Sequence, residues 1–222
     1  VDGIIDRFKD WSRVSVAPVI CGTWEVVLPI AIDPITRRKL ILVKQLYQQA
    51  EKQSGLQHSL SNRIMSVIGF DLAVETLMKV AIGALDQRRQ PAEGFPGLLE
   101  QCDSLLSRHG LPSLTDRAHV LHVHSIRNDT QHKAKYPSIT DTSDCRTYAR
   151  DFCRSVTKNT WGISFDGISP LEWIDDSTLR ELLEISLLDI RAHRHKKGIA
   201  LGGIAFSWAS ECIMSFLPRG AE

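Results

Sequence analysis

Apolar residues recur every three to four positions along almost the whole chain after residue 33, which is the spacing of amphipathic helices. Glycine, proline and short polar runs interrupt the pattern and separate one helix from the next. Asp33 is suited to cap the free N–H groups of a first turn, and Pro34 needs no donor there. Ser113 opens an S-x-x-D capping pattern further along the chain. The predicted helices cover residues 34–53, 61–86, 96–108, 114–132, 144–160, 177–197 and 199–217.

This pattern predicts an all-α fold in three parts. Residues 1–32 form an N-terminal segment that is irregular or partly strand, with residues 23–32 as the candidate strand. Residues 33–165 form a helical bundle. Residues 166–222 supply C-terminal helices, a helical hairpin packed on the bundle or part of it.

The composition is that of an ordinary globular protein. A chain of 24.9 kDa with 43% hydrophobic residues can bury a substantial core. The net charge is only +1, so any nucleic-acid site must be local. The five cysteines are scattered and include no C-x-x-C pair, which argues against a disulfide framework and a zinc finger and favours a cytoplasmic protein. The chain begins with Val1 instead of methionine, which is consistent with a piece of a longer protein.

The apolar run at residues 64–85 is long enough to span a membrane but carries Asp71, Glu75 and Lys79. We therefore expect a buried helix, no signal peptide and no membrane partner. The three charged residues are four positions apart and share one narrow stripe of the helix. That stripe must face water, a partner charge or a site.

The run Arg127-Asn128-Asp129-Thr130-Gln131-His132 places two chemically useful groups at the end of a predicted helix. The planar guanidinium of Arg127 can bind a phosphate, and His132 can exchange a proton near neutral pH. RNA carries its own nucleophile, the 2′-hydroxyl, so these two groups suffice in principle for RNA cleavage without a metal. The alternative is a solvated helix end whose arginine pairs with a nearby aspartate.

Helix geometry limits how this run can work. Asn128 and His132 lie one turn apart on the same face, whereas Arg127 and His132 point roughly 140° apart. Either the helix unwinds around Asp129 and Thr130, or the run faces a second copy of itself across a symmetric interface.

Residues 120–132, followed by Lys133-Ala-Lys-Tyr-Pro137, resemble the HEPN domains (higher eukaryote and prokaryote nucleotide-binding), which are all-α bundles. The family signature is an arginine, usually followed by a polar residue, with a histidine four to six residues later. Arg127, Asn128 and His132 match it position by position. The helix containing Tyr148 and Phe152, and an earlier helix at residues 70–79, also look like family elements, and the likeness extends over residues 33–161.

The resemblance implies a metal-independent endoribonuclease that acts as a homodimer, typically in prokaryotic defence, stress or toxin–antitoxin systems. His132 would then be the general base or acid, Arg127 the phosphate clamp, and Asn128 a residue that orients the histidine or binds the phosphate. Glu75 and Lys79 would help to position these three residues without taking part in the reaction. Neither a cofactor nor a metal is implied, and an antitoxin or another defence-system subunit is an expected partner. The family also includes noncatalytic members, so the alternative is a nucleotide-binding or protein-interaction module of a larger defence protein.

Positive charge gathers after the motif in the sequence. Residues 127–158 contain seven basic side chains against four aspartates. Four of the basic residues recur every fourth position along one helix, where they could track a phosphate backbone or form an ordinary solvated face. The residues predicted to contact RNA are Lys133, Lys135, Arg146, Arg150 and Arg154.

Two other groups are weaker candidates. His119, His122 and His124 invite a metal interpretation, but helical offsets turn His124 away from the other two and no cysteine or carboxylate set completes a site. The basic run at residues 191–197 either contacts RNA or simply complements the dipole of a helix C-terminus.

Overall fold

The structure is a computed structural model that describes residues 29–56, 59–174 and 176–216, without the side chains of residues 211–216. Within these ranges every regular element is a helix and no strand occurs, which confirms the all-α prediction. Two short 3₁₀ helices, η2 and η3, interrupt the α-helices. The elements are α1 (Pro34–Gly55), α2 (Leu60–Leu85), α3 (Phe95–Arg108), α4 (Arg117–His132), α5 (Ile139–Trp161), η2 (Phe165–Gly167), η3 (Pro170–Trp173), α6 (Ser177–Arg191) and α7 (His195–Phe216).

Most predicted helix boundaries lie within two residues of the observed ones, and the larger differences have local causes. Asp33 caps α1 as expected, accepting hydrogen bonds from the N–H groups of residues 35 and 36. α5 begins five residues earlier than predicted, because Ser138 and Asp141 form a reciprocal capping box. α4 begins at Arg117 instead of residue 114, after Asp116, which has a left-handed backbone (φ 58°).

The predicted position of the break between the last two helices is also wrong. The sequence predicted one helix over residues 177–197, but α6 ends at Arg191. His193 adopts a positive φ of 60°, and the N–H of Arg194 returns to the carbonyl oxygen of Asp189. The turn therefore falls inside the basic run, and its final lysines belong to α7.

The N-terminal segment predicted as irregular or partly strand lies mostly outside the described residues. Residues 29–33 are irregular, and the N–H of Ile30 donates to the carbonyl oxygen of Thr160 at 2.9 Å. Pro29 packs against Gly162 at the end of α5. These contacts join the entry to α1 to the end of α5.

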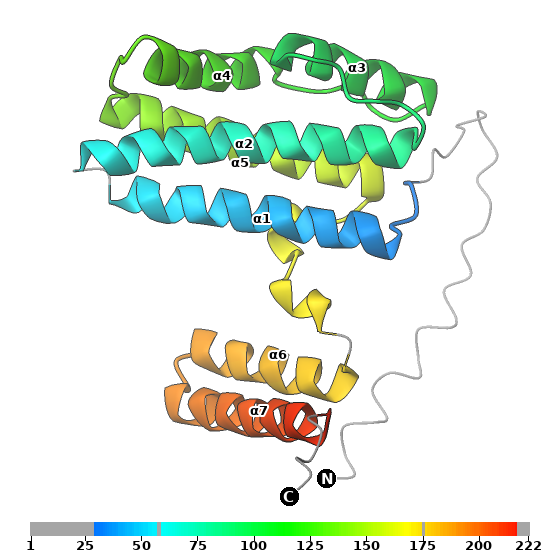
Figure 1. Cartoon of the computed structure of the whole chain (residues 1–222), viewed down its shortest axis with the longest axis vertical. Coiled ribbons are helices and arrows are strands. Elements are labelled where there is room, and N and C mark those ends of the chain that lie inside the picture. Colours follow the sequence, from blue (N-terminus) through cyan, green and yellow to red (C-terminus); the bar gives the residue numbers. More distant parts are fainter. Residues whose placement is uncertain (1–28, 57–58, 175, 217–222) are drawn as a thin grey trace, which may run out of the picture.

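α2 is the central helix of the bundle. Figure 1 shows it beside α1, with α5 behind the pair and α3 and α4 along the upper edge. Buried residues occupy several sides of α2, as expected for a helix that packs against four others, and include Phe70, Val74, Leu77, Met78 and Ala81. No helix in the described ranges has the length and apolar character needed to span a membrane.

α6 and α7 form an antiparallel hairpin below the bundle in Figure 1, connected to it through η2 and η3. The two helices approach closely at Gly198, whose carbonyl oxygen accepts a hydrogen bond from the Ser186 hydroxyl at 2.7 Å. A Cβ at Gly198 would lie 2.6 Å from Cγ1 of Ile190. The small residues on this side of α7 therefore set the spacing of the hairpin.

The α1–α2 contact predicts opposite effects for two glycines on the same helix. A Cβ added at Gly69 would lie 2.8 Å from the Cβ of Ala50 on α1, whereas one added at Gly83 meets nothing within 4 Å. We expect Gly69→Ala to lower the free energy of unfolding by about 1–3 kcal/mol, because α1 and α2 must separate. Gly83→Ala should raise it by roughly 0.5–1 kcal/mol through helix propensity. Urea unfolding followed by circular dichroism measures both, and equal effects would contradict a close approach of α1 and α2 at Gly69.

Candidate functional site

Arg127 is held in a defined position at the α2–α4 contact. Val120 and Val123 bury the same side of α4 in the core, and Arg127 follows on that side. Its Nε lies 3.4 Å from Oδ2 of Asp71, and its Nη1 donates to Oδ1 of Asn128 at 2.8 Å. The side chain is 28% exposed, so the guanidinium is oriented by the protein and still accessible to a ligand.

Asp71 is the buried acid at the centre of this contact. Its side chain is only 2% exposed, although it belongs to the charged stripe predicted on α2. Its two carboxylate oxygens lie 3.0 and 3.3 Å from Nδ1 of His124. Burial raises the pKa of Asp71, and the opposing effects of His124 and Arg127 do not cancel it. At Asp71, the charged stripe of α2 therefore faces partner side chains of α4 instead of water.

His124 belongs to this site, although the sequence suggested it only as a metal ligand. Its ring stacks on Phe95 of α3 with centroids 4.1 Å apart and planes at 12°. The side chain is 19% exposed. Two signals in the sequence pointed to it: His124 precedes Arg127 by three positions, which places both on neighbouring parts of one face, and Asp71 is an acid inside an apolar helix.

His132 is the last residue of α4 and is exposed. α4 remains helical through His132, so the suggestion that the helix unwinds around Asp129 and Thr130 is wrong. Arg127 and His132 do not contact each other, and the oxygen of Asn128 accepts from Arg127 instead of contacting His132. A single copy of the chain therefore does not bring the three motif side chains together.

Glu75 and Lys79 form an ion pair with each other. Their Oε1 and Nζ atoms are 2.5 Å apart, one turn along α2. Glu75 lies one turn from Asp71 and adds a small upward effect to the pKa of Asp71. Neither residue has a contact with Arg127 or His132 in the described structure.

Lys133 and Lys135 follow the motif directly and both pair with Asp129, at 2.7 and 3.5 Å. These contacts, led by the hydrogen bond from Lys133, lower the pKa of Asp129. Beside them is a cavity of about 200 Å³ between the end of α4 and the start of α5. Its lining includes His122, Asp129, Lys135, Tyr136 and Asp141. The surface next to the motif thus has a small polar hollow.

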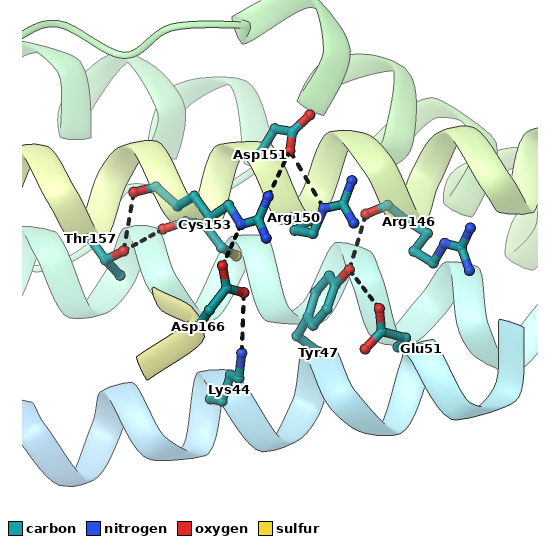
Figure 2. Close-up of polar contacts among 10 residues, drawn as sticks. Lys44, Tyr47, Glu51, Arg146, Arg150, Asp151, Cys153, Thr157 and Asp166 are labelled. Carbon is teal, nitrogen blue, oxygen red and sulfur yellow. Dashed lines mark hydrogen bonds and ion pairs between the residues drawn. The ribbon is translucent and has the colours of Figure 1, made fainter. Parts of the chain in front are cut away.

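The basic row of α5 lies elsewhere. Tyr148, which faces α4, stacks on His119 with centroids 4.1 Å apart. Arg150 is two residues further along, roughly 160° around the helix. Figure 2 shows Arg146 and Arg150 on α5, close to Tyr47 of α1, at the surface where α1 and α5 adjoin (the α1–α5 surface). The structure therefore does not gather the predicted RNA-binding arginines around Arg127 and His132.

Carboxylates already pair with much of the basic row. Arg154 lies 2.7 Å from Asp166. Lys44 lies 3.7 Å from the other oxygen of the same carboxylate (Figure 2). Arg150 lies 3.6 Å from Asp151. Arg146 has no ion pair within the described part of the chain. Among the three arginines of the row, Arg146 is therefore the one best placed to bind an external anion.

Buried side chains lie beneath the α1–α5 surface. Lys44 is 7% exposed and its Nζ lies 4.4 Å from the centre of the Phe165 ring. The Tyr47 hydroxyl donates to the carbonyl oxygen of Arg146 at 3.3 Å. Burial raises the pKa of the Tyr47 hydroxyl, so it remains protonated near neutral pH. The α1–α5 surface therefore rests on buried side chains, and part of its positive charge is already paired.

Metal and thiol chemistry find little support in the described residues. No group of three or more histidine, cysteine, aspartate or glutamate side chains there could hold a metal ion. Cys102, Cys145 and Cys153 are buried, which raises the pKa of each thiol to about 12. These three cysteines are unsuited to act as nucleophiles near neutral pH.

The chain matches no family model, and comparison with curated proteins and with solved structures finds no similar protein. The assignment of a function therefore depends on the geometry around Asp71 and on the motif itself.

The raised pKa of Asp71 predicts how stability depends on pH. Because folded Asp71 binds its proton more tightly than unfolded Asp71, the wild type loses stability as the pH rises from about 4 through the folded pKa. Asp71→Asn removes this loss. We expect the free energy of unfolding of Asp71→Asn, relative to wild type, to increase from pH 4 to pH 7. Urea titrations across that range measure the difference, and a decrease would show that the cationic partners outweigh burial.

Proposed function

We propose that this protein is a metal-independent endoribonuclease of the HEPN type. The observation that carries the proposal is the arrangement of Arg127, a partly exposed guanidinium fixed by buried Asp71 and by Asn128. Holding an arginine in this way costs the protein the burial of a carboxylate, which is typical of groups arranged for binding or catalysis. A preoriented guanidinium can bind a phosphate through two parallel hydrogen bonds.

The active form that we propose contains two copies of the chain. Because α4 is regular, Arg127 and His132 point roughly 140° apart and cannot meet at one phosphate within a single helix. Leu121, Asn128 and His132 lie on one face of α4, and Leu121 is 39% exposed. This exposed leucine on the same face as Asn128 and His132 supports a two-fold contact in which each His132 faces the other copy.

The reaction would use the 2′-hydroxyl of RNA as the nucleophile. One group removes the 2′-hydroxyl proton, the 2′-oxygen forms a bond to phosphorus, and the bond from phosphorus to the 5′-oxygen breaks. A second group protonates the departing 5′-oxygen. The products are a 2′,3′-cyclic phosphate and a 5′-hydroxyl. His132 would perform one proton transfer, while Arg127 stabilises the additional negative charge on the phosphoryl oxygens.

The remaining predicted residues would act in RNA binding. Lys133 and Lys135 lie next to the motif and would contact the nucleotides flanking the cleaved phosphate. Arg146, Arg150 and Arg154 lie along α5 at the α1–α5 surface and would hold a more distant part of the strand. Glu75 and Lys79 would support the surface around Asp71. A cytoplasmic defence or toxin system, with an antitoxin or another subunit as regulator, is the setting that we propose.

Mutation of the motif tests the ribonuclease directly. We expect His132→Ala and Arg127→Ala each to lower the rate of RNA cleavage in EDTA by about 100-fold or more, because a proton-transfer group or the phosphate clamp is lost. Arg117→Ala is the matched control, since Arg117 is on the same helix but pairs with Asp103 at 3.0 Å. Cleavage is measured by gel electrophoresis, with thermal unfolding and molecular mass confirming that each variant folds and associates as the wild type does.

Two outcomes would decide against this function. Cleavage of an RNA whose scissile nucleotide lacks the 2′-hydroxyl would exclude the proposed nucleophile. A folded, dimeric wild type that cleaves no RNA would instead favour a noncatalytic nucleotide-binding or protein-interaction module.

Arg146 allows a test of the salt dependence of RNA binding. Arg146 has no ion pair within the described ranges, so Arg146→Gln should weaken binding to single-stranded RNA and reduce the slope of log K against log salt by roughly 0.7. Arg88→Gln, in the loop after α2, is the control and should leave the slope unchanged. Fluorescence anisotropy at several salt concentrations measures both slopes. An unchanged slope for Arg146→Gln would show that Arg146 makes no phosphate contact.

A further inference from the structure

The reaction requires two proton transfers at one phosphate, and His132 accounts for one of them. We propose that His124 is the second proton-transfer residue, acting beside Arg127 of the same chain. This inference rests on the proposed ribonuclease function and adds a catalytic group that the R-x4-H signature does not contain.

The contact with Asp71 prepares His124 for proton transfer. An ionised Asp71 carboxylate can only accept a hydrogen bond, so Nδ1 of His124, 3.0 Å from Oδ1, carries the ring proton when the imidazole is neutral. Nε2 is then the free basic nitrogen, and it has no hydrogen-bond partner in the described structure. Stacking on Phe95 fixes the plane of the ring, and the 19% exposure of the side chain leaves access for a ligand.

Asp71 also sets the position of His124 relative to Arg127. One carboxylate oxygen lies 3.0 Å from His124 Nδ1, and the other lies 3.4 Å from Arg127 Nε. The two side chains therefore converge on a single carboxylate and leave α4 from adjacent turns. A phosphate bound by Arg127 would be next to His124. Glu75, one turn along α2, is the further charged group near this carboxylate.

His132 of the same chain cannot share that phosphate with His124. The two residues are eight positions apart, which corresponds to about 12 Å along a straight helix. A second copy facing the first would bring its own His132 toward Arg127 and His124. Each composite site would then hold one proton acceptor and one proton donor, as cleavage demands. After the 2′-hydroxyl proton has moved to one histidine, the other gives its proton to the 5′-oxygen, and the net number of protons is unchanged.

His119 provides a matched control on the same helix. It lies five positions before His124, stacks on Tyr148 with ring centroids 4.1 Å apart, and has no contact with Asp71. Its imidazole has the same chemistry without the carboxylate that orients His124. A general role of histidines in folding or RNA binding would affect both residues alike.

The experiment compares wild type, His124→Ala, His119→Ala, Arg127→Ala and His132→Ala on one RNA in EDTA. We expect His124→Ala to lower kcat by about 100-fold or more with little change in KM. Added imidazole should restore a measurable part of the lost rate, because a small base can occupy the space of the missing ring. His119→Ala should cleave at the wild-type rate. Asp71→Asn should also lower kcat more than it changes KM, since Asp71 positions the ring.

Three results would overturn the inference. Wild-type kcat in His124→Ala would show that His124 takes no part, and loss of activity without imidazole rescue would show a purely structural role. If either result accompanies inactive Arg127→Ala and His132→Ala variants, the ribonuclease proposal stands and only the role of His124 fails. A wild type that cleaves no RNA would remove both proposals. Thermal unfolding of His124→Ala shows whether the variant is folded under the assay conditions.

Discussion

The proposed site depends on one interaction, the contact of the buried Asp71 carboxylate with two side chains of α4. The carboxylate orients His124 through one oxygen and Arg127 through the other. Without it, His124 would keep only its stacking on Phe95 and Arg127 only its hydrogen bond to Asn128, so each side chain would have more freedom to change rotamer. Burial of Asp71 is unfavourable for its ionised form, as the direction of its pKa shift indicates. Local stability is therefore exchanged for a fixed geometry, which is common at functional sites.

The packing of α2 makes this interaction possible. α2 is apolar on most sides and contacts four other helices, so a carboxylate within it has little access to water. The close approach at Gly69 holds α1 against one side of α2, while α4 crosses another. Side chains of α4 that point toward α2 must then supply the hydrogen-bond and charge partners of the Asp71 carboxylate. The buried valines fix the position of α4 against the bundle, and the polar residues beside them supply its chemistry.

Much of the fold was predictable because helix patterns are local. The seven predicted helices all occur, and Asp33 caps the first one as expected. The prediction of the start of α5 was wrong because Ser138 and Asp141 form side-chain hydrogen bonds to nearby backbone N–H groups. The boundaries near Asp116 and His193 were wrong because these non-glycine residues adopt positive φ. Such conformations depend on a few atoms and leave a weak trace in the apolar pattern.

The sequence by itself determined the helical class, the placement of Arg127 and His132 on different sides of α4, and the charged stripe on α2, because each of these follows from helical periodicity. Only the tertiary structure decided which charges meet. It paired Asp71 with His124 and Arg127, and it placed Arg146 and Arg150 at the α1–α5 surface, next to Tyr47. Contacts between helices depend on which faces pack together and at what distance. The spacing of apolar residues along one helix does not determine how that helix lines up with its neighbour.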